Sequence, residues 1–177
     1  MPSTSNMFRK PATSLRTPRA EDGAAIWNLV RDCKPLDENS MYCNLIQCDH
    51  FRDTCVVAEL NGQIAGWISA YVVPSDETRT LFVWQVAVAP AARGTGLGAK
   101  MLQHLLRRDA CDEVERLQTT ITSDNDASWA LFRKLARLEK GELGHTAHYT
   151  REGHFDGRHA TEHMVTIDLP ERMKKAA

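Results

Sequence analysis

The sequence predicts a mixed α/β fold in which one central, mostly antiparallel sheet is flanked by helices on both faces. Two observations indicate this fold. Apolar residues change from helical spacing near the start to strand-like runs, and then alternate between the two patterns. The 177 residues also fit one domain with its own core. That domain is expected over residues 13–170, between an N-terminal tail at 1–12 and a C-terminal tail at 171–177.

The first helix is expected to start at Thr17 and Pro18, after a short strand at residues 13–16. Thr17 is a good N-cap, and Pro18 suits the first helical position because its missing N–H has no helical partner there. Pro35 is expected to end this helix. A second helical patch follows at residues 41–46.

The middle of the chain has the pattern of strands. Residues 55–60 and 64–73 are joined by Asn61-Gly62, which favours a tight hairpin because both residues tolerate positive φ. Residues 80–88 (TLFVWQVAV) are apolar at nearly every position. A strand with no polar face is covered on both sides, so this strand is expected at the centre of the sheet.

The C-terminal half alternates between helices and strands. Helices are expected over 97–106 and 127–138, and β-prone runs mark strands at 116–121 and 164–169. A His- and Gly-rich stretch precedes the last strand, and the predicted element order includes one further strand there. The complete order is β-α-α-β-β-β-α-β-α-β-β.

Composition excludes several classes of function. The chain has 22 basic and 23 acidic residues and a net charge of −1, which argues against nucleic acid or an anionic membrane as the main partner. No apolar run approaches the roughly 18 residues of a membrane helix, and the N-terminus lacks the apolar segment of a secretory signal. The five cysteines include no C-x-x-C pair, so buried free thiols in a reducing compartment are expected. A cytoplasmic location follows as the expectation.

The glycine-rich turn after residues 80–88 carries the clearest chemical signal. A strand runs into Arg93-Gly94-Thr95-Gly96-Leu97-Gly98 and then a helix. Glycines let the backbone approach a ligand, and a helix start presents free N–H groups to a phosphate. No G-K-[ST] follows, so a Walker A loop is absent, and the spacing is not that of a dinucleotide fold. A merely structural turn is the alternative.

This segment resembles the [QR]-x-x-G-x-[GA] motif of the GNAT acetyltransferase superfamily. A second family element, an Asn followed by a helix ending in [YF]-x-K, resembles residues 125–134 (NDASWALFRK). The predicted element order over residues 13–169 is also similar. The resemblance implies the GNAT-like acyl-CoA N-acyltransferase fold, with acetyl-CoA as co-substrate and no metal.

The resemblance also implies which residues contact acetyl-CoA. The pantetheine arm is expected along the backbone of Val86 and Val88, and the pyrophosphate on the N–H groups of the glycine turn. Residues of the next helix are expected to face the thioester. The full set is Val86, Ala87, Val88, Arg93, Gly94, Thr95, Gly96, Leu97, Gly98, Asn125, Ser128 and Phe132.

Acetylation of an amine requires a base. An alkylammonium with a pKa of about 10.4 costs ~4.6 kcal/mol to deprotonate at pH 7. A strand N–H near Val86 is the family's device for the developing oxyanion. The family often has a tyrosine acid where this chain has Phe132. A thiol with a pKa of about 8.5 can leave without full protonation, so the missing hydroxyl is tolerable. Tyr42 or a water is the candidate substitute for the absent acid.

Four further stretches resemble the diaminobutyrate acetyltransferases of ectoine synthesis: residues 36–42, 50–59, 80–86 and 159–163. That family transfers acetyl to the 4-amino group of L-2,4-diaminobutyrate and is usually homodimeric. By resemblance the acceptor-side residues are Asp37, Tyr42, Trp84, His159 and Glu162. The residue types agree, because a cationic acceptor calls for acids and an aromatic wall.

The roles within this set stay open. Either Asp37 or Glu162 is the candidate base, but Asp37 would also suit a helix cap and Glu162 a solvated strand end. Trp84 would also suit the core. The partner of the substrate carboxylate also stays open: Arg79 is near the right strand, but its position lies on a polar loop.

Rival interpretations also remain. Residues 159–163 (HATEH) match the H-x-x-E-H of some zinc proteases, which would require that segment to be helical. His145 and His148 raise a similar possibility. The same fold could also acetylate another small amine or a protein N-terminus, or serve as a non-catalytic acetyl-CoA sensor.

Overall fold

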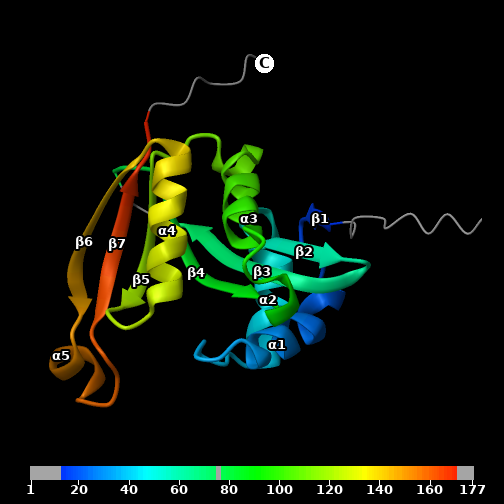
Figure 1. The fold of residues 1–177 in the computed structure, drawn as a ribbon, viewed down its shortest axis with the longest axis horizontal. Coiled ribbons are helices and arrows are strands. Elements are labelled where there is room, and N and C mark those ends of the chain that lie inside the picture. Colours follow the sequence, from blue (N-terminus) through cyan, green and yellow to red (C-terminus); the bar gives the residue numbers. More distant parts are fainter. Residues whose placement is uncertain (1–12, 75–76, 171–177) are drawn as a thin grey trace, which may run out of the picture.

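The computed structural model describes residues 13–74 and 77–170, and the expected tails at 1–12 and 171–177 lie outside them. Seven strands form one sheet in the order β1-β2-β3-β4-β5-β7-β6 (Figure 1). All neighbours are antiparallel except β4 and β5, which are parallel. The strands are β1 Thr13–Arg16, β2 Val56–Leu60, β3 Gln63–Val72, β4 Thr80–Val88, β5 Arg116–Thr122, β6 Glu142–Tyr149 and β7 Glu162–Asp168. The predicted mostly antiparallel sheet, with residues 80–88 at its centre, is confirmed.

Helices cover both faces of this sheet, as predicted. They are α1 Gly23–Asp32, α2 Met41–His50, α3 Leu97–Leu106, α4 Asp126–Glu139 and α5 Arg151–Phe155. In Figure 1, α3 and α4 lie over one face and α1 and α2 over the other, while α5 stands apart at the end of the β6–β7 arm. No helix in the described ranges is both long and apolar enough to cross a membrane.

The two faces have separate cores. The larger core lies under α3 and α4 and includes Leu81 and Val83 of β4. The smaller core lies under α1 and α2 and includes Trp67 of β3 and Ala87 of β4. Residues 81 and 83 therefore face one side and residue 87 the other, although strict alternation would put all three on the same side.

A β-bulge in β4 explains this change of side. Gln85 pairs with Ser69 of β3, but Val83 pairs with Ala70, so Trp84 is an extra residue without a cross-strand partner. An inserted residue reverses the alternation beyond it. Trp84 is consequently 52% exposed, whereas Gln85 is 6% exposed.

The start of α1 differs from the prediction. The helix begins at Gly23, after a 3₁₀ turn over Ala20–Asp22, and not at Pro18. An Asp22 carboxylate oxygen accepts a hydrogen bond from the Arg19 backbone N–H at 2.7 Å, which sets the chain turn there. Arg16 holds the same carboxylate. The local cap signal at Thr17 is overridden by this tertiary ion pair.

The stretch before the last strand contains more structure than its composition indicated. It holds β6, which pairs with β7 along its length, and the short helix α5, which the sequence did not predict. Thr150 caps α5 by accepting a hydrogen bond from the Gly153 N–H. β7 begins at Glu162, two residues before the predicted 164.

We expect the Arg16 network to stabilise the fold in a pH-dependent way. Arg16 bonds Asp22 and Glu59, each at 2.7 Å, and its hydrogen bond lowers the pKa of Asp22. A lowered carboxyl pKa contributes stability above the unfolded value of about 3.9 and loses it as pH falls through the folded value. Arg16→Met should therefore lower the free energy of unfolding by about 1 kcal/mol at pH 7, since solvent screens the network partly.

Urea denaturation at several pH values checks this expectation. The difference between Arg16→Met and wild type should disappear under acid conditions. Arg158→Met is the matched control, because the Arg158–Asp156 pair is exposed at both ends. A loss for Arg16→Met that persists unchanged in acid would contradict the assignment.

Candidate active site

The site lies where β4 and β5 separate. Their ladder covers Thr80–Phe82 of β4 and Arg116–Gln118 of β5, after which the two parallel strands diverge. On the other side of β4, Ala89 donates to the Ala65 carbonyl. Since hydrogen-bonded and non-bonded pairs alternate in an antiparallel ladder, the backbone N–H and C=O of Val86 and Val88 point into the gap.

Two cavities fill this gap and adjoin each other. One has a volume of about 440 Å³ and the other about 500 Å³. The residues that line both are Pro35, Leu36, Val86, Asn125 and Ser128. A molecule extending from one cavity into the other would pass this common stretch. We call the larger the donor cavity and the smaller the acceptor cavity.

The donor cavity is built on the glycine turn at the start of α3. Gly94 and Gly96 have φ of +76° and +79°, a backbone conformation that glycine adopts without strain. Leu97 and Gly98 then open the helix, whose free N–H groups and dipole favour an anion. Of the described residues lining this cavity, Lys34, Arg93 and Lys134 are basic and none is acidic. The cavity suits a phosphorylated ligand.

The backbone groups of β4 that face the gap differ in whether they already hydrogen-bond to other residues of the chain. The Val88 carbonyl already accepts from Arg93 Nε at 3.2 Å and from Cys33 Sγ at 3.3 Å. Arg93 therefore braces the strand as well as lining the cavity. Val86 remains the β4 residue whose backbone faces the common stretch of the two cavities.

Lys134 is a donor-side residue that the sequence prediction left out. It lies on α4, and its Nζ approaches within 3.5 Å of where a Cβ on Gly96 would stand. This places an ammonium group directly at the glycine turn. The sequence contained a signal for this residue, because Lys134 is the last residue of the family motif at residues 125–134. Only the packing of α4 against α3 shows that its ammonium group lies at the glycine turn.

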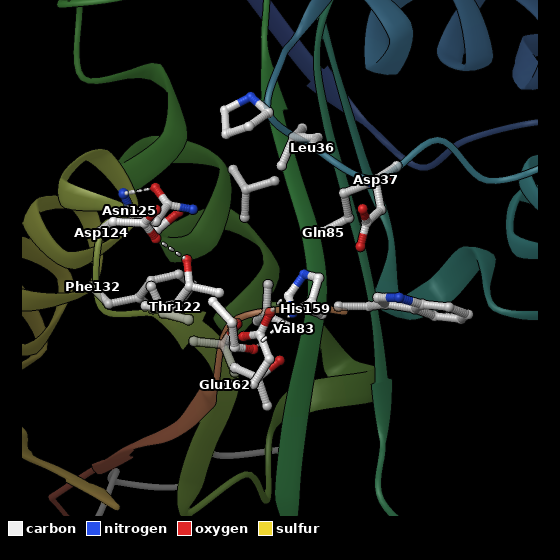
Figure 2. A pocket seen from close by; sticks show the side chains of 18 of the residues that line it. Leu36, Asp37, Val83, Gln85, Thr122, Asp124, Asn125, Phe132, His159 and Glu162 are labelled. Atoms are coloured by element: carbon white, nitrogen blue, oxygen red, sulfur yellow. Dashed lines mark hydrogen bonds and ion pairs between the residues drawn. The ribbon is translucent and has the colours of Figure 1, made fainter. Parts of the chain in front are cut away.

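The acceptor cavity has the opposite charge. Asp37, Asp124 and Glu162 line it, and of the described lining residues none is Lys or Arg. In Figure 2, Asp124 and Asn125 lie on one side of the cavity and Asp37 on the other, with Glu162 and His159 below them. Such a cavity favours a small cation.

Glu162 is the acid of the acceptor cavity whose pKa is raised, whereas the hydrogen bond from Thr122 lowers the pKa of Asp124. Burial raises the pKa of Glu162 above its ordinary value, and the negative charge of Asp37 adds to the rise, while His159 opposes it. The His159 Nε2 lies 3.9 Å from a Glu162 oxygen. A carboxylate with a raised pKa accepts a proton more readily near neutral pH, which suits a general base.

The walls of the cavity hold these groups in place. Asn125 caps α4 by accepting a hydrogen bond from the Ser128 N–H at 3.1 Å. Thr122 Oγ1 donates to Asp124 at 2.6 Å. Phe132 is 2% exposed and closes the cavity from α4. Thr120, Thr122, Asp124 and Asn39 are lining residues that the sequence did not single out.

Most of the predicted site residues come together here. The acceptor cavity contains Asp37, Trp84, Val86, Asn125, Ser128, Phe132, His159 and Glu162, and the donor cavity adds Val88, Arg93, Gly94, Gly96, Leu97 and Gly98. Trp84 is the exposed bulge residue and not a core residue.

Four predicted residues are not among those lining the two cavities. Ala87 of β4 is fully buried in the core under α1 and α2, and Thr95 donates through Oγ1 to the Ala92 carbonyl. Tyr42 is 71% exposed in the first turn of α2. Arg79 is exposed and directly precedes β4, at the opposite end of that strand from the residues that border the cavities. Contacts of these four with a substrate remain predictions.

The zinc-protease interpretation does not fit the observed structure. Glu162 and His163 begin β7, and His159 lies in the preceding loop, so the H-x-x-E-H segment is not helical. Neighbouring strand residues point to opposite faces, which separates Glu162 from His163. Within residues 13–74 and 77–170, no group of three or more His, Cys, Asp or Glu side chains is arranged to hold a metal ion.

The cysteines do not form disulfides. All five are free, and four of them are buried. Burial raises the pKa of both Cys48 and Cys55 to about 12, so these two thiols stay protonated at neutral pH. This agrees with the expected packing role. No cysteine is among the described residues that line the acceptor cavity.

Comparison with known proteins identifies the family. Residues 23–136 match the acetyltransferase (GNAT) family, and the chain belongs to that family. A curated relative from Vibrio parahaemolyticus is 49% identical over 88% of this chain and 85% of its own length. Another from Bordetella parapertussis is 50% identical over 80% of this chain and 73% of its own. Both are L-2,4-diaminobutyric acid acetyltransferases.

A solved structure supports the same grouping. It is the diaminobutyrate acetyltransferase EctA from Paenibacillus lautus, in complex with L-2,4-diaminobutyric acid and coenzyme A. The two chains are 38% identical and superpose with a TM-score of 0.86 over 93% of this chain and 99% of that one. The predicted GNAT-like fold is therefore confirmed.

Lys134→Met should raise the KM for acetyl-CoA about tenfold and leave kcat nearly unchanged, because it removes one charge-assisted contact from binding and none from the reacting atoms. Steady-state kinetics with varied acetyl-CoA measure this. Arg137→Met, also an exposed cation on α4 but outside the residues lining the donor cavity, is the control. An unchanged KM in Lys134→Met would remove Lys134 from the site.

Proposed function

We propose that this chain transfers the acetyl group of acetyl-CoA to the 4-amino group of L-2,4-diaminobutyrate. The observation that carries the proposal is the junction of a basic, glycine-lined cavity with an acid-lined cavity at Val86. The first suits the phosphates and pantetheine of coenzyme A, and the second suits a small diamine. The names of the relatives give L-2,4-diaminobutyric acid as the molecule acetylated, and the EctA complex contains it together with coenzyme A.

Deprotonation of the substrate amine is the first chemical step. An ammonium with a pKa of about 10.4 must lose its proton before it can attack, and Glu162 is the base we assign. Its raised pKa supports this choice over Asp37. Asp37 then holds the second ammonium group of the substrate. Trp84 supplies an aromatic wall at the mouth of the cavity.

The neutral amine next attacks the thioester carbonyl at the stretch common to both cavities. The carbonyl oxygen gains negative charge, and the Val86 N–H, which points into the gap, is placed to stabilise it. Collapse of the tetrahedral intermediate expels the thiolate of coenzyme A, and the nitrogen releases its surplus proton, which balances the charge of the thiolate and leaves the neutral amide. Phe132 has no hydroxyl to protonate that thiolate, and a thiol pKa of about 8.5 makes departure as the anion feasible. Tyr42 or a water remains the proposed proton donor.

The wider setting of the enzyme is also part of the proposal. By resemblance, the product N4-acetyl-L-2,4-diaminobutyrate serves ectoine biosynthesis and osmoadaptation. The same resemblance supports a homodimer in the cytoplasm. Analytical ultracentrifugation of the purified chain tests the dimer, and a single species at the monomer mass would contradict it.

A thiol-release assay against a panel of amines tests the function. The panel contains L-2,4-diaminobutyrate, its one-carbon-longer homologue ornithine, an aminoglycoside and a peptide with a free N-terminus. Diaminobutyrate should be the fastest acceptor, and mass spectrometry with NMR should locate the acetyl group on N4. Preference for the peptide or aminoglycoside would support the alternative acceptors, and failure to release thiol with any amine would support a sensor of acetyl-CoA.

Glu162→Gln should lower kcat about 100-fold at neutral pH, because the amide cannot accept the proton. In the wild type, kcat/KM should rise with pH through a pKa above that of an ordinary glutamate, and this limb should vanish in the variant. pH-rate profiles of both proteins measure the effect. Glu142→Gln, at an exposed position of β6, is the control.

Thermal unfolding separates catalytic loss from misfolding in this variant. A raised folded pKa means that ionised Glu162 opposes folding once the pH exceeds its unfolded pKa. Glu162→Gln should thus be at least as stable as wild type at pH 7. Near-normal kcat in a folded Glu162→Gln protein would instead favour Asp37 as the base.

A further inference from the structure

Gln85 is a buried polar residue that borders the acceptor cavity. It follows the bulge at Trp84 and pairs with Ser69, so its side chain lies on the α1/α2 face of the sheet. It is 6% exposed and lines the acceptor cavity. The sequence pattern did not single it out, because residues 80–88 were interpreted as one strand that is apolar at nearly every position.

Gln85 connects the central strand to the loop that carries Asp37. Its Nε2 donates to the Asp37 backbone carbonyl at 2.9 Å. Asp37 lies between α1 and α2, in a loop also tied at its far end by Trp27 Nε1, which donates to the Asn39 carbonyl at 2.9 Å. Figure 2 shows Gln85 next to Asp37 at the edge of the cavity. The bond fixes the backbone from which the Asp37 carboxylate projects.

Packing alone does not explain a glutamine at this position. The Gln85 Oε1 is buried and has no hydrogen-bond partner in the described part of the chain, and the same holds for Ser69 Oγ opposite it. Buried polar atoms without a partner destabilise a fold. An apolar side chain of the same length would fill the space without that penalty, but it would lose the hydrogen bond to Asp37.

We propose that Gln85 is a positioning residue, whose amide holds the Asp37 loop so that the Asp37 carboxylate meets the second ammonium group of the acceptor. The proposal rests on the proposed function, because it takes the acceptor to be a diamine. Gln85 acts through Asp37 and not on the reacting atoms. Its loss should therefore weaken acceptor binding and leave donor binding intact.

Gln85→Met tests this role, since methionine has similar length and no donor. We expect the KM for diaminobutyrate to rise about tenfold, the KM for acetyl-CoA to stay within twofold, and the melting temperature not to fall. Ser69→Ala is the matched control, because it changes the buried cross-strand neighbour without touching the Asp37 loop. Equal losses for both substrates with a lower melting temperature would mean a purely structural role and would overturn the proposal.

A double-mutant cycle with Asp37→Ala supplies the sharper test. If Gln85 works through Asp37, Gln85→Met should change kcat/KM for the acceptor by less than twofold in the Asp37→Ala background. Additive losses would overturn the proposal. A monoamine acceptor gives a second readout, because it lacks the second ammonium and should be nearly insensitive to Gln85→Met.

The design also distinguishes failure of this inference from failure of the proposed function. The wild-type turnover of diaminobutyrate is measured first and decides the function alone. The cycle is then run on whichever diamine the wild type acetylates fastest. Coupling between Gln85 and Asp37 on a diamine other than diaminobutyrate would sustain the positioning role, and absence of coupling on that fastest diamine would refute it.

Discussion

The divergence of β4 from β5 is the constraint on which the rest of the site depends. Parallel strands that pair over Thr80–Phe82 and then separate leave one edge of β4 unpaired inside the molecule. Unpaired backbone groups in a fold interior demand a partner. A substrate amide can be that partner, and the gap accordingly opens into two joined cavities. The bulge at Trp84 is the second constraint on the site, because it turns Gln85 toward the Asp37 loop and leaves Val86 facing the gap.

Charge is divided between these cavities more sharply than the whole chain suggests. The net charge is −1, but the donor cavity is lined by Lys34, Arg93 and Lys134 and the acceptor cavity by Asp37, Asp124 and Glu162. A polyanionic cofactor and a cationic amine are each drawn to their own side of the strand. Burial of Glu162 in the wall of the acceptor cavity then gives its carboxylate a proton affinity that an exposed glutamate lacks.

Several features were predictable because they depend on residues close in sequence. The glycine turn at 93–98 has its positive φ angles where glycines stand, and the hairpin at Asn61-Gly62 has positive φ at both residues. The strand at 80–88, which is apolar at nearly every position, lies at the sheet centre. The start of α1 was wrong, because Arg16 reaches Asp22 and moves the turn beyond Thr17.

The sequence by itself determined the order of elements apart from α5, the phosphate-type turn and the residue types that a cationic acceptor needs. Only the tertiary structure decided which of them share a cavity. The bulge at Trp84 exists through pairing with β3. The approach of Lys134 to the glycine turn and the hydrogen bond from Gln85 to Asp37 join segments that are distant in sequence. Local propensity acts over a few residues, whereas register and helix packing are set by the whole core, so no pattern within one segment reveals them.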